Sequence, residues 1–198
     1  MVRPLFRFQL VRAYLFDPKV RRIVQAIADR DADLGKLATV WDTNSSALLS
    51  RRLFQSVDMN AAHKYMYKPN LRKLMFRTGP AGHDQDVEIE DAPEIRQALQ
   101  EVHTSFVAAS YDRFGFRRVD ADLTRDCEAH VLFLGDSFTD GMWVSDSDTF
   151  VNRYGHLMRE RSNLRVCPVN AGVNGYGSLE EAYVLEHSFE AAGQPRVV

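Results

Sequence analysis

The segment LFLGDSFTDG, residues 132–141, places a hydroxyl where an apolar strand would end. The apolar run before it suits a strand that is buried on both faces, and open parallel sheets bind ligands beyond the carboxyl ends of their strands. Ser137 would lie at that edge, and Gly135 would let the chain turn sharply before it. Such a hydroxyl can attack a carbonyl carbon while its own backbone N–H faces the same cleft. The alternative is that Ser137 only caps or decorates a turn.

A cluster of glycines follows the next predicted strand. In the segment VNAGVNGYGS the glycines are Gly172, Gly175 and Gly177. Glycine lets a backbone N–H approach a ligand closely, as an oxyanion hole requires. This second cluster favours a nucleophilic role for Ser137 over a role in a turn.

Short apolar segments predict the strands that position these two motifs. HVLFLG (130–135) is a continuous apolar run ended by glycine. LRVCPVN (164–170) is a second strand candidate, and its Pro168 indicates an edge strand. The segment GQPRVV (193–198) is typical of the start of a third strand.

Helices are predicted between these strands. The segment 145–161 begins with an Asp/Ser cap and places Phe150, Tyr154, Leu157 and Met158 on one face. The segment 177–189 opens with Ser178 and Glu181 in the spacing of a capping box. Alternation of strand and helix predicts a parallel sheet with right-handed crossovers.

The two motifs, in this order, resemble those of the SGNH (GDSL-type) hydrolases. GDSFTDG matches the family's Gly-Asp-Ser-x-x-x-Gly nucleophile block, and VNAGVNGYGS matches its second block. DRFGFRR (112–118) resembles the Gly-Phe-Arg segment that leads into the catalytic domain of many bacterial members. The resemblance covers residues 111–198 and implies a three-layer α/β/α, flavodoxin-like fold with a parallel sheet.

The resemblance also implies roles for single residues. Ser137 would be the nucleophile, and its own N–H together with that of Gly175 would hold the oxyanion. Asp136 would shape the turn through hydrogen bonds and would not act as a base. An acyl-enzyme would form and water would release it, without a dissociable cofactor. The substrate would be a lipid ester, an acetylated sugar or a small ester.

Two later blocks of the family are missing from the sequence. One is Gly-x-Asn-Asp, which supplies an oxyanion-hole Asn, and the other is Asp-x-x-His, which supplies the base and its orienting acid. We therefore expect residues 111–198 to be the first part of the catalytic domain, with a sheet that is incomplete at its C-terminus. As a truncated chain it should be inactive or impaired.

None of the histidines stands in an Asp-x-x-His setting. The six are His63, His83, His103, His130, His156 and His187. His130 would begin a strand at the end opposite Ser137, and His156 and His187 fall along helices. Surface or packing roles are expected for these three. His83, in a Gly/Pro-rich loop, has the most freedom to reach a distant site.

We expect no metal site. Asp140, Asp146 and Asp148 are carboxylates spaced along a loop, where such groups usually face solvent or cap helices. The segment DCEAH (126–130) holds a Cys-x-x-His pair, but no second pair of this kind completes a zinc site.

Two other classes of protein remain as alternatives. A P-loop is excluded because no Gly-Lys-Ser/Thr follows the first predicted strand, and Thr139 replaces the last glycine of an α/β-hydrolase elbow. A flavodoxin-like module could use the hydroxyl-rich loop to bind a phosphate or nucleotide. A non-catalytic fragment is the third reading.

Length and composition set broad limits. The chain has 198 residues, 45% hydrophobic composition and a net charge of -2, which gives no preference for nucleic acid. It has neither the ~20 apolar residues of a membrane span nor a signal-peptide core, so we place it in the cytoplasm by default. Cys127 and Cys167 could form one bridge, but two buried thiols are expected. The oligomeric state is not predicted.

Residues 1–110 are expected to form a mainly helical region of unknown role. A helix should follow Asp17, with Pro18 at its first position, and a second should run from about residue 42 to the segment YKPN. VEIE (87–90) alternates like a short strand, and a further helix is predicted over 91–106. The basic N-terminus could contact a membrane surface as an amphipathic helix, although packing on its own domain is favoured.

Overall fold

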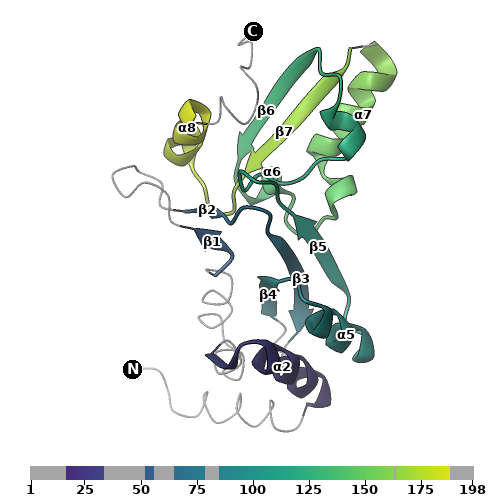
Figure 1. The fold of residues 1–198 in the computed structure, drawn as a ribbon, viewed down its shortest axis with the longest axis vertical. Helices are drawn as coiled ribbons and strands as arrows, with labels where there is room; N and C mark the ends of the chain where they lie inside the picture. The colour runs from purple at the N-terminus through teal and green to yellow at the C-terminus, as the bar shows by residue number, and fades with distance from the viewer. Residues whose placement is uncertain (1–16, 34–51, 56–64, 79–84, 163, 188–198) are drawn as a thin grey trace. The chain divides into compact units, whose positions relative to one another are not determined.

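The computed structural model describes residues 17–33, 52–55, 65–78, 85–162 and 164–187. Over these residues the chain is mixed α/β, with helices, a small parallel sheet and antiparallel pairings (Figure 1). Its contacts divide it into two compact units, each built from two stretches of chain. The first unit is Met1–Leu53 with Lys73–Val107, and the second is Phe54–Arg72 with Ala108–Val198.

Two helices pack together in the first unit. Helix α2 (Pro18–Arg30) begins where the sequence predicts, because the Asp17 carboxylate accepts hydrogen bonds from the first N–H groups of the helix. Its apolar face is buried and packs on α5 (Pro93–Glu101), as Ile23 and Leu99 illustrate with 0% exposure each.

The helix predicted over 91–106 is shorter in the structure. It ends at Glu101, and His103 adopts a left-handed φ of 54° just beyond it. Thr104 N–H then donates to the Leu99 carbonyl, which closes the helix end. Phe106 consequently belongs to a strand.

Three strands form one sheet in the order β4-β3-β5, in which β3 and β4 are an antiparallel pair. They are β3 (Arg72–Thr78), β4 (Gln85–Glu90) and β5 (Phe106–Ser110). The prediction of a strand at VEIE is confirmed by β4. Lys73 and Glu88 are both buried and form an ion pair at 3.0 Å, which compensates each charge for its lost hydration.

These strands correct the expectation of a mainly helical N-terminal region, at least for its described part. Four successive residues of β3 are buried, so the segment lacks the alternation that identifies a half-exposed strand. The second predicted helix is also wrong at Phe54–Gln55, which form strand β1 and pair antiparallel with β2 (Met66–Tyr67). The basic N-terminus and most of that second helix lie outside the described residues.

The second unit contains the parallel strand pair that the sequence predicts. Strands β6 (Ala129–Gly135) and β7 (Val166–Gly172) run side by side, with Gly135 opposite Gly172 (Figure 1). The helices that follow them, α7 (Phe150–Ser162) and α8 (Ser178–His187), are also confirmed. The third predicted strand, at 193–198, lies outside the described residues.

Helix α7 packs on one face of this strand pair. The Phe133 ring of β6 meets Phe150 and Tyr154 edge to face, with centroids 5.7 and 5.1 Å apart. A side chain at Gly155 would collide with Leu123 and Pro168, at 2.7 and 2.8 Å from the added Cβ, so glycine permits the close approach.

The face predicted for this helix is only partly right. Val151, Asn152 and Gly155 are its buried residues, whereas Phe150 and Leu157 are 49% and 42% exposed. Gly155 and Asn152 are buried where the helix meets the strands, instead of the larger apolar side chains that the periodicity predicts.

The capping pattern at the start of helix α8 lies one residue earlier in the sequence than predicted. Gly177 N–H donates to the Glu180 carboxylate at 3.0 Å, and Glu181 N–H donates to the Gly177 carbonyl. Gly177 and Glu180 therefore take the places expected for Ser178 and Glu181.

A disulfide joins Cys127 to Cys167, with Cα atoms 5.5 Å apart. The expectation of two buried thiols is therefore wrong. Sequence spacing could not reveal the bridge, because it depends on the segment before β6 lying against the start of β7. Within the described part of the chain, every helix is too short or too polar to cross a bilayer.

Candidate active site

Ser137 is the first residue of a short helix, α6 (Ser137–Asp140), that begins directly after β6. The turn between them needs glycine, because Gly135 has a φ of 154° and an added Cβ would lie 2.1 Å from the Thr139 hydroxyl oxygen. The chain thereby passes from strand to helix with only Asp136 between them. This geometry leaves Ser137 half-buried at the carboxyl edge of the sheet.

Asp136 is the N-cap of this helix. Its carboxylate accepts a hydrogen bond from Phe138 N–H at 2.9 Å, and its carbonyl accepts one from Asp140 N–H at 2.9 Å. The side chain is thus engaged by the backbone of the turn. The structure gives Asp136 a role in shaping the turn, as the sequence suggests.

The Ser137 hydroxyl and backbone N–H have no hydrogen-bond partner among the described residues. The same holds for the N–H of Gly175, which adopts a left-handed φ of 82° three residues beyond β7. Because Gly135 and Gly172 are paired in register, both unused donors follow the same edge of the strand pair. Two unsatisfied N–H groups at such an edge are what a developing oxyanion would need.

Gly172 has a different role. Its N–H already donates to the Asn170 side chain at 3.1 Å, so it is not available to a ligand. A Cβ at this position would lie 2.2 Å from the Asp140 nitrogen. Gly172 therefore lets the end of β7 press against the backbone of helix α6.

Two tyrosines hold the loop that carries Gly175. Tyr65, just before β2, donates its phenolic hydrogen to the Asn174 carbonyl at 3.0 Å. Tyr176 donates to the Tyr65 carbonyl at 2.5 Å, and the two rings pack edge to face. Burial, with a further effect of the Glu180 charge, raises the pKa of Tyr65. The phenol therefore stays protonated and able to donate.

Asp140 anchors the other end of α6. It is fully buried and accepts hydrogen bonds from Tyr111 at 2.9 Å and from Tyr67 at 3.3 Å. Burial, and then the negative charge of Asp140, raises the pKa of Tyr111 well above its ordinary value. The two phenols thus solvate a carboxylate that has no access to water.

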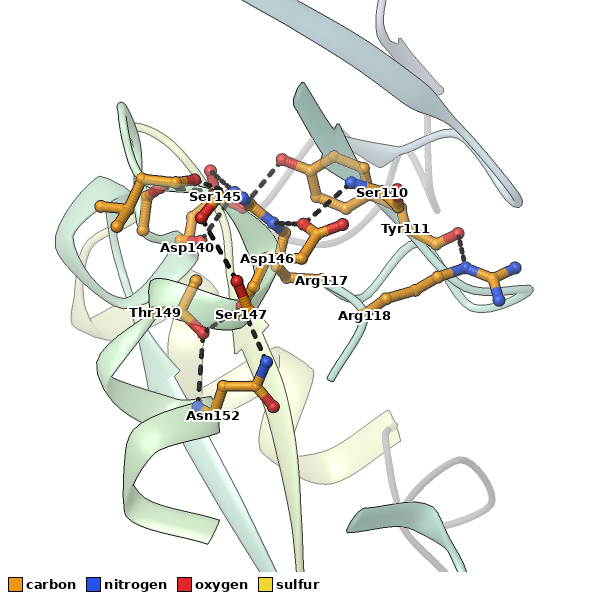
Figure 2. A network of polar contacts seen from close by, with 12 residues as sticks. Ser110, Tyr111, Arg117, Arg118, Asp140, Ser145, Asp146, Ser147, Thr149 and Asn152 are labelled. Carbon is orange, nitrogen blue, oxygen red and sulfur yellow. Dashed lines mark hydrogen bonds and ion pairs between the residues drawn. The ribbon is translucent and has the colours of Figure 1, made fainter. Parts of the chain in front are cut away.

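Arg117 ties the loop after α6 to the same anchor (Figure 2). Its guanidinium donates to the Asp140 carbonyl at 3.1 Å, to the Val144 carbonyl at 2.7 Å and to the Asp146 carboxylate at 2.6 Å. Burial lowers the pKa of Arg117, but the charges of Asp140 and Asp146 outweigh it, so the net shift is upward. The residue is only 2% exposed, so its side chain serves the fold of this loop and not a solvent-borne ligand.

The carboxylates considered as metal ligands have partners in the protein. Asp146 also accepts from Ser110 N–H at 3.1 Å, and Asp148 pairs with Arg153 at 2.8 Å. These bonds account for the run of acidic residues after Ser137.

Two described histidines of the second unit occupy other positions. His130 is the second residue of β6, at the end opposite Ser137, and His156 pairs with Asp120 at 2.8 Å. No histidine in the described ranges bonds to Ser137. His63 and His83 fall outside those ranges.

Comparisons with protein-family models, curated proteins and solved structures found no match. The resemblance to SGNH hydrolases therefore rests on the two motifs and on the roles that their residues can take.

Sequence reasoning singled out Ser137, Asp136 and Gly175 as candidates but missed the residues that hold them. Tyr65 and Tyr67 lie seventy or more positions before the nucleophile, and nothing in their local pattern marks them. One pattern in the sequence pointed to Arg117, because this residue belongs to the Gly-Phe-Arg segment of the resemblance.

Proposed function

We propose that the chain carries the nucleophile and part of the oxyanion hole of an SGNH-type serine esterase or acylhydrolase. The observation that carries the proposal is a pair of N–H groups, on Ser137 and Gly175, that bond to none of the described residues and lie beyond paired parallel strands. The complete domain would have a three-layer α/β/α fold, of which β6, β7 and their helices are one part.

In this reaction the Ser137 oxygen attacks the carbonyl carbon of an ester. The carbonyl oxygen becomes an oxyanion that accepts hydrogen bonds from the two N–H groups. Collapse of the intermediate breaks the ester bond, releases the alcohol and leaves an acyl group on Ser137. Water then hydrolyses this acyl-enzyme and restores the hydroxyl.

An ester fits the surroundings of Ser137 better than a phosphate does. The Asp136 carboxylate already takes the Phe138 N–H, so the turn presents negative charge to an incoming anion. Phe138 is 84% exposed next to the nucleophile and offers an apolar surface to an acyl or alkoxy group. The acyl group could come from a lipid, an acetylated sugar or a small ester.

The proton of Ser137 needs a base, and no Asp-x-x-His block occurs in the 198 residues. Acylation by this chain should therefore be slow. Added imidazole should accelerate it by acting as the missing base.

Incubation with p-nitrophenyl acetate tests the proposal. Intact mass spectrometry should reveal one acetyl group, which peptide mapping assigns to Ser137, and imidazole should increase its rate of formation. Ser137→Ala should remove the adduct, whereas Ser147→Ala, on an exposed serine of the following loop, should not. Acetylation that is equal in Ser137→Ala and the parent would exclude the proposed nucleophile.

A further inference from the structure

Two sulfur atoms and an imidazole lie together at the start of the parallel strand pair. His130 of β6 is directly opposite Cys167 of β7, and Cys127 lies three residues before His130. One ligand atom from each residue lies within 4.8 Å of the others. Zinc bound tetrahedrally by sulfur and nitrogen keeps these atoms ~3.5–3.8 Å apart, from Zn–S of ~2.3 Å and Zn–N of ~2.0 Å. Small side-chain rotations would bring the three atoms to that spacing once the disulfide is open.

Hydrogen bonds also join the starts of the two strands, beside the disulfide. Glu128 N–H donates to the Arg165 carbonyl at 2.9 Å, and Arg165 N–H donates back to the Glu128 carboxylate at 2.8 Å. The strands then continue in register from Ala129 and Val166. Reduction should therefore leave both thiols close to His130.

A cavity gives access to the cluster. It has a volume of about 330 Å³, and its wall includes Cys127, His130 and Cys167 as well as Thr124 and Arg118. Three protein ligands beside an open cavity leave a fourth position for water or a small anion. This arrangement is typical of a reactive zinc centre, whereas structural zinc sites have four protein ligands.

We propose that the reduced Cys127–Cys167 pair forms, with His130, a three-ligand site for zinc or a similar soft divalent cation. A dithiol reductant opens the disulfide by thiol–disulfide exchange, giving two thiols on the protein and a disulfide on the reductant. The cation then binds two thiolates and a neutral imidazole, and each thiol releases one proton. The site is separate from Ser137, which lies at the other end of β6.

From the sequence alone we expect no metal site here, because no second pair of ligand residues accompanies the Cys-x-x-His pair. The third ligand comes from the parallel register, which places Cys167 beside His130 although 37 positions separate them in the chain. The disulfide and the metal site would be alternative states of the same two sulfurs.

Cobalt titration tests the proposal on the whole chain. After reduction with a phosphine and removal of oxygen, the protein should bind one Co²⁺ and develop thiolate charge-transfer and tetrahedral d–d bands. Zn²⁺ should displace the cobalt. His130→Gln should weaken binding by at least about tenfold, since it removes a direct ligand. His103→Gln, a histidine of the first unit, is the matched control and should bind like the parent.

Three binding results would overturn the proposal. The first is Co²⁺ binding by the reduced parent that is no tighter than binding by the double variant Cys127→Ser and Cys167→Ser. The second is equally tight binding by the oxidised protein, and the third is undiminished binding by His130→Gln. A reduced chain that loses its cooperative melting transition and does not regain it with Zn²⁺ would also contradict the proposal, because the ligands would not be preorganised. Supporting results are the thiolate bands in the reduced parent and their loss in the double variant.

Discussion

At the scale of single residues, the glycine that ends β7 and the glycine three residues beyond it have separable roles. Gly172 is a contact position, because any side chain would meet the backbone of helix α6. Gly175 is a conformational position, because its left-handed φ exposes an N–H that the described residues do not use. The sequence could place both in one cluster, but only the structure separates packing from the candidate oxyanion donor.

Gly175→Ala should slow acylation of Ser137 more than it changes stability. The left-handed backbone becomes strained, and an added Cβ would lie 2.8 Å from the Tyr65 hydroxyl, so the donor should shift. Loss of one oxyanion donor typically costs ~3–4 kcal/mol in the transition state. The rate of acetyl transfer from p-nitrophenyl acetate, compared with the free energy of unfolding in urea, measures the two effects.

Gly172→Ala should instead destabilise the second unit, because its added Cβ meets rigid backbone. If Gly172→Ala were stable yet slow in acylation while Gly175→Ala behaved like the parent, the assignment of the donor would be reversed.

At the scale of elements, the short helix α6 depends on what is buried beneath it. Asp140 receives two phenolic hydrogens, and the Arg117 guanidinium lies 4.0 Å from its carboxylate. The strands and helices around α6 could be predicted because apolar runs, glycines and caps mark their limits. The tyrosines and the arginine that fix α6 could not, since a single buried polar contact leaves no periodic pattern.

Asp140→Asn should lower the free energy of unfolding by ~3 kcal/mol, because it leaves the buried Arg117 charge with less compensation. Urea unfolding followed by circular dichroism measures the change. Asp148→Asn is the matched control: its pair with Arg153 is exposed, so its effect should stay within ~1 kcal/mol. Equal effects of the two substitutions would show that the buried network does not stabilise this unit.

At the scale of the whole molecule, the two units differ in how far the sequence describes them. The second unit contains both motifs, and its alternating strand and helix order was predictable. The first unit contains strand β3, whose residues are buried in succession and do not alternate. Segment 54–72 belongs to the second unit, although it is far in sequence from the rest of that unit, 108–198. Neither arrangement follows from local patterns.

The disulfide should stabilise the second unit chiefly by restricting its unfolded chain. Its cysteines are 40 positions apart, and a loop of that size corresponds to ~4 kcal/mol in the chain-entropy treatment. The Cys127→Ser, Cys167→Ser variant, measured in urea with a chelator present, should lose up to that amount. A parent protein whose unfolding midpoint is unchanged by reductant would indicate that the bridge does not form in solution.

The most direct test of the central claim is the site of reaction with a fluorophosphonate probe. The probe phosphonylates an activated serine and mimics the oxyanion, so it depends on both the nucleophile and its N–H donors. We predict slow, stoichiometric labelling of the parent at Ser137, faster labelling with imidazole and none in Ser137→Ala, while Ser147→Ala labels like the parent. Labelling at another serine, or no labelling of the folded chain even with imidazole, would contradict the account.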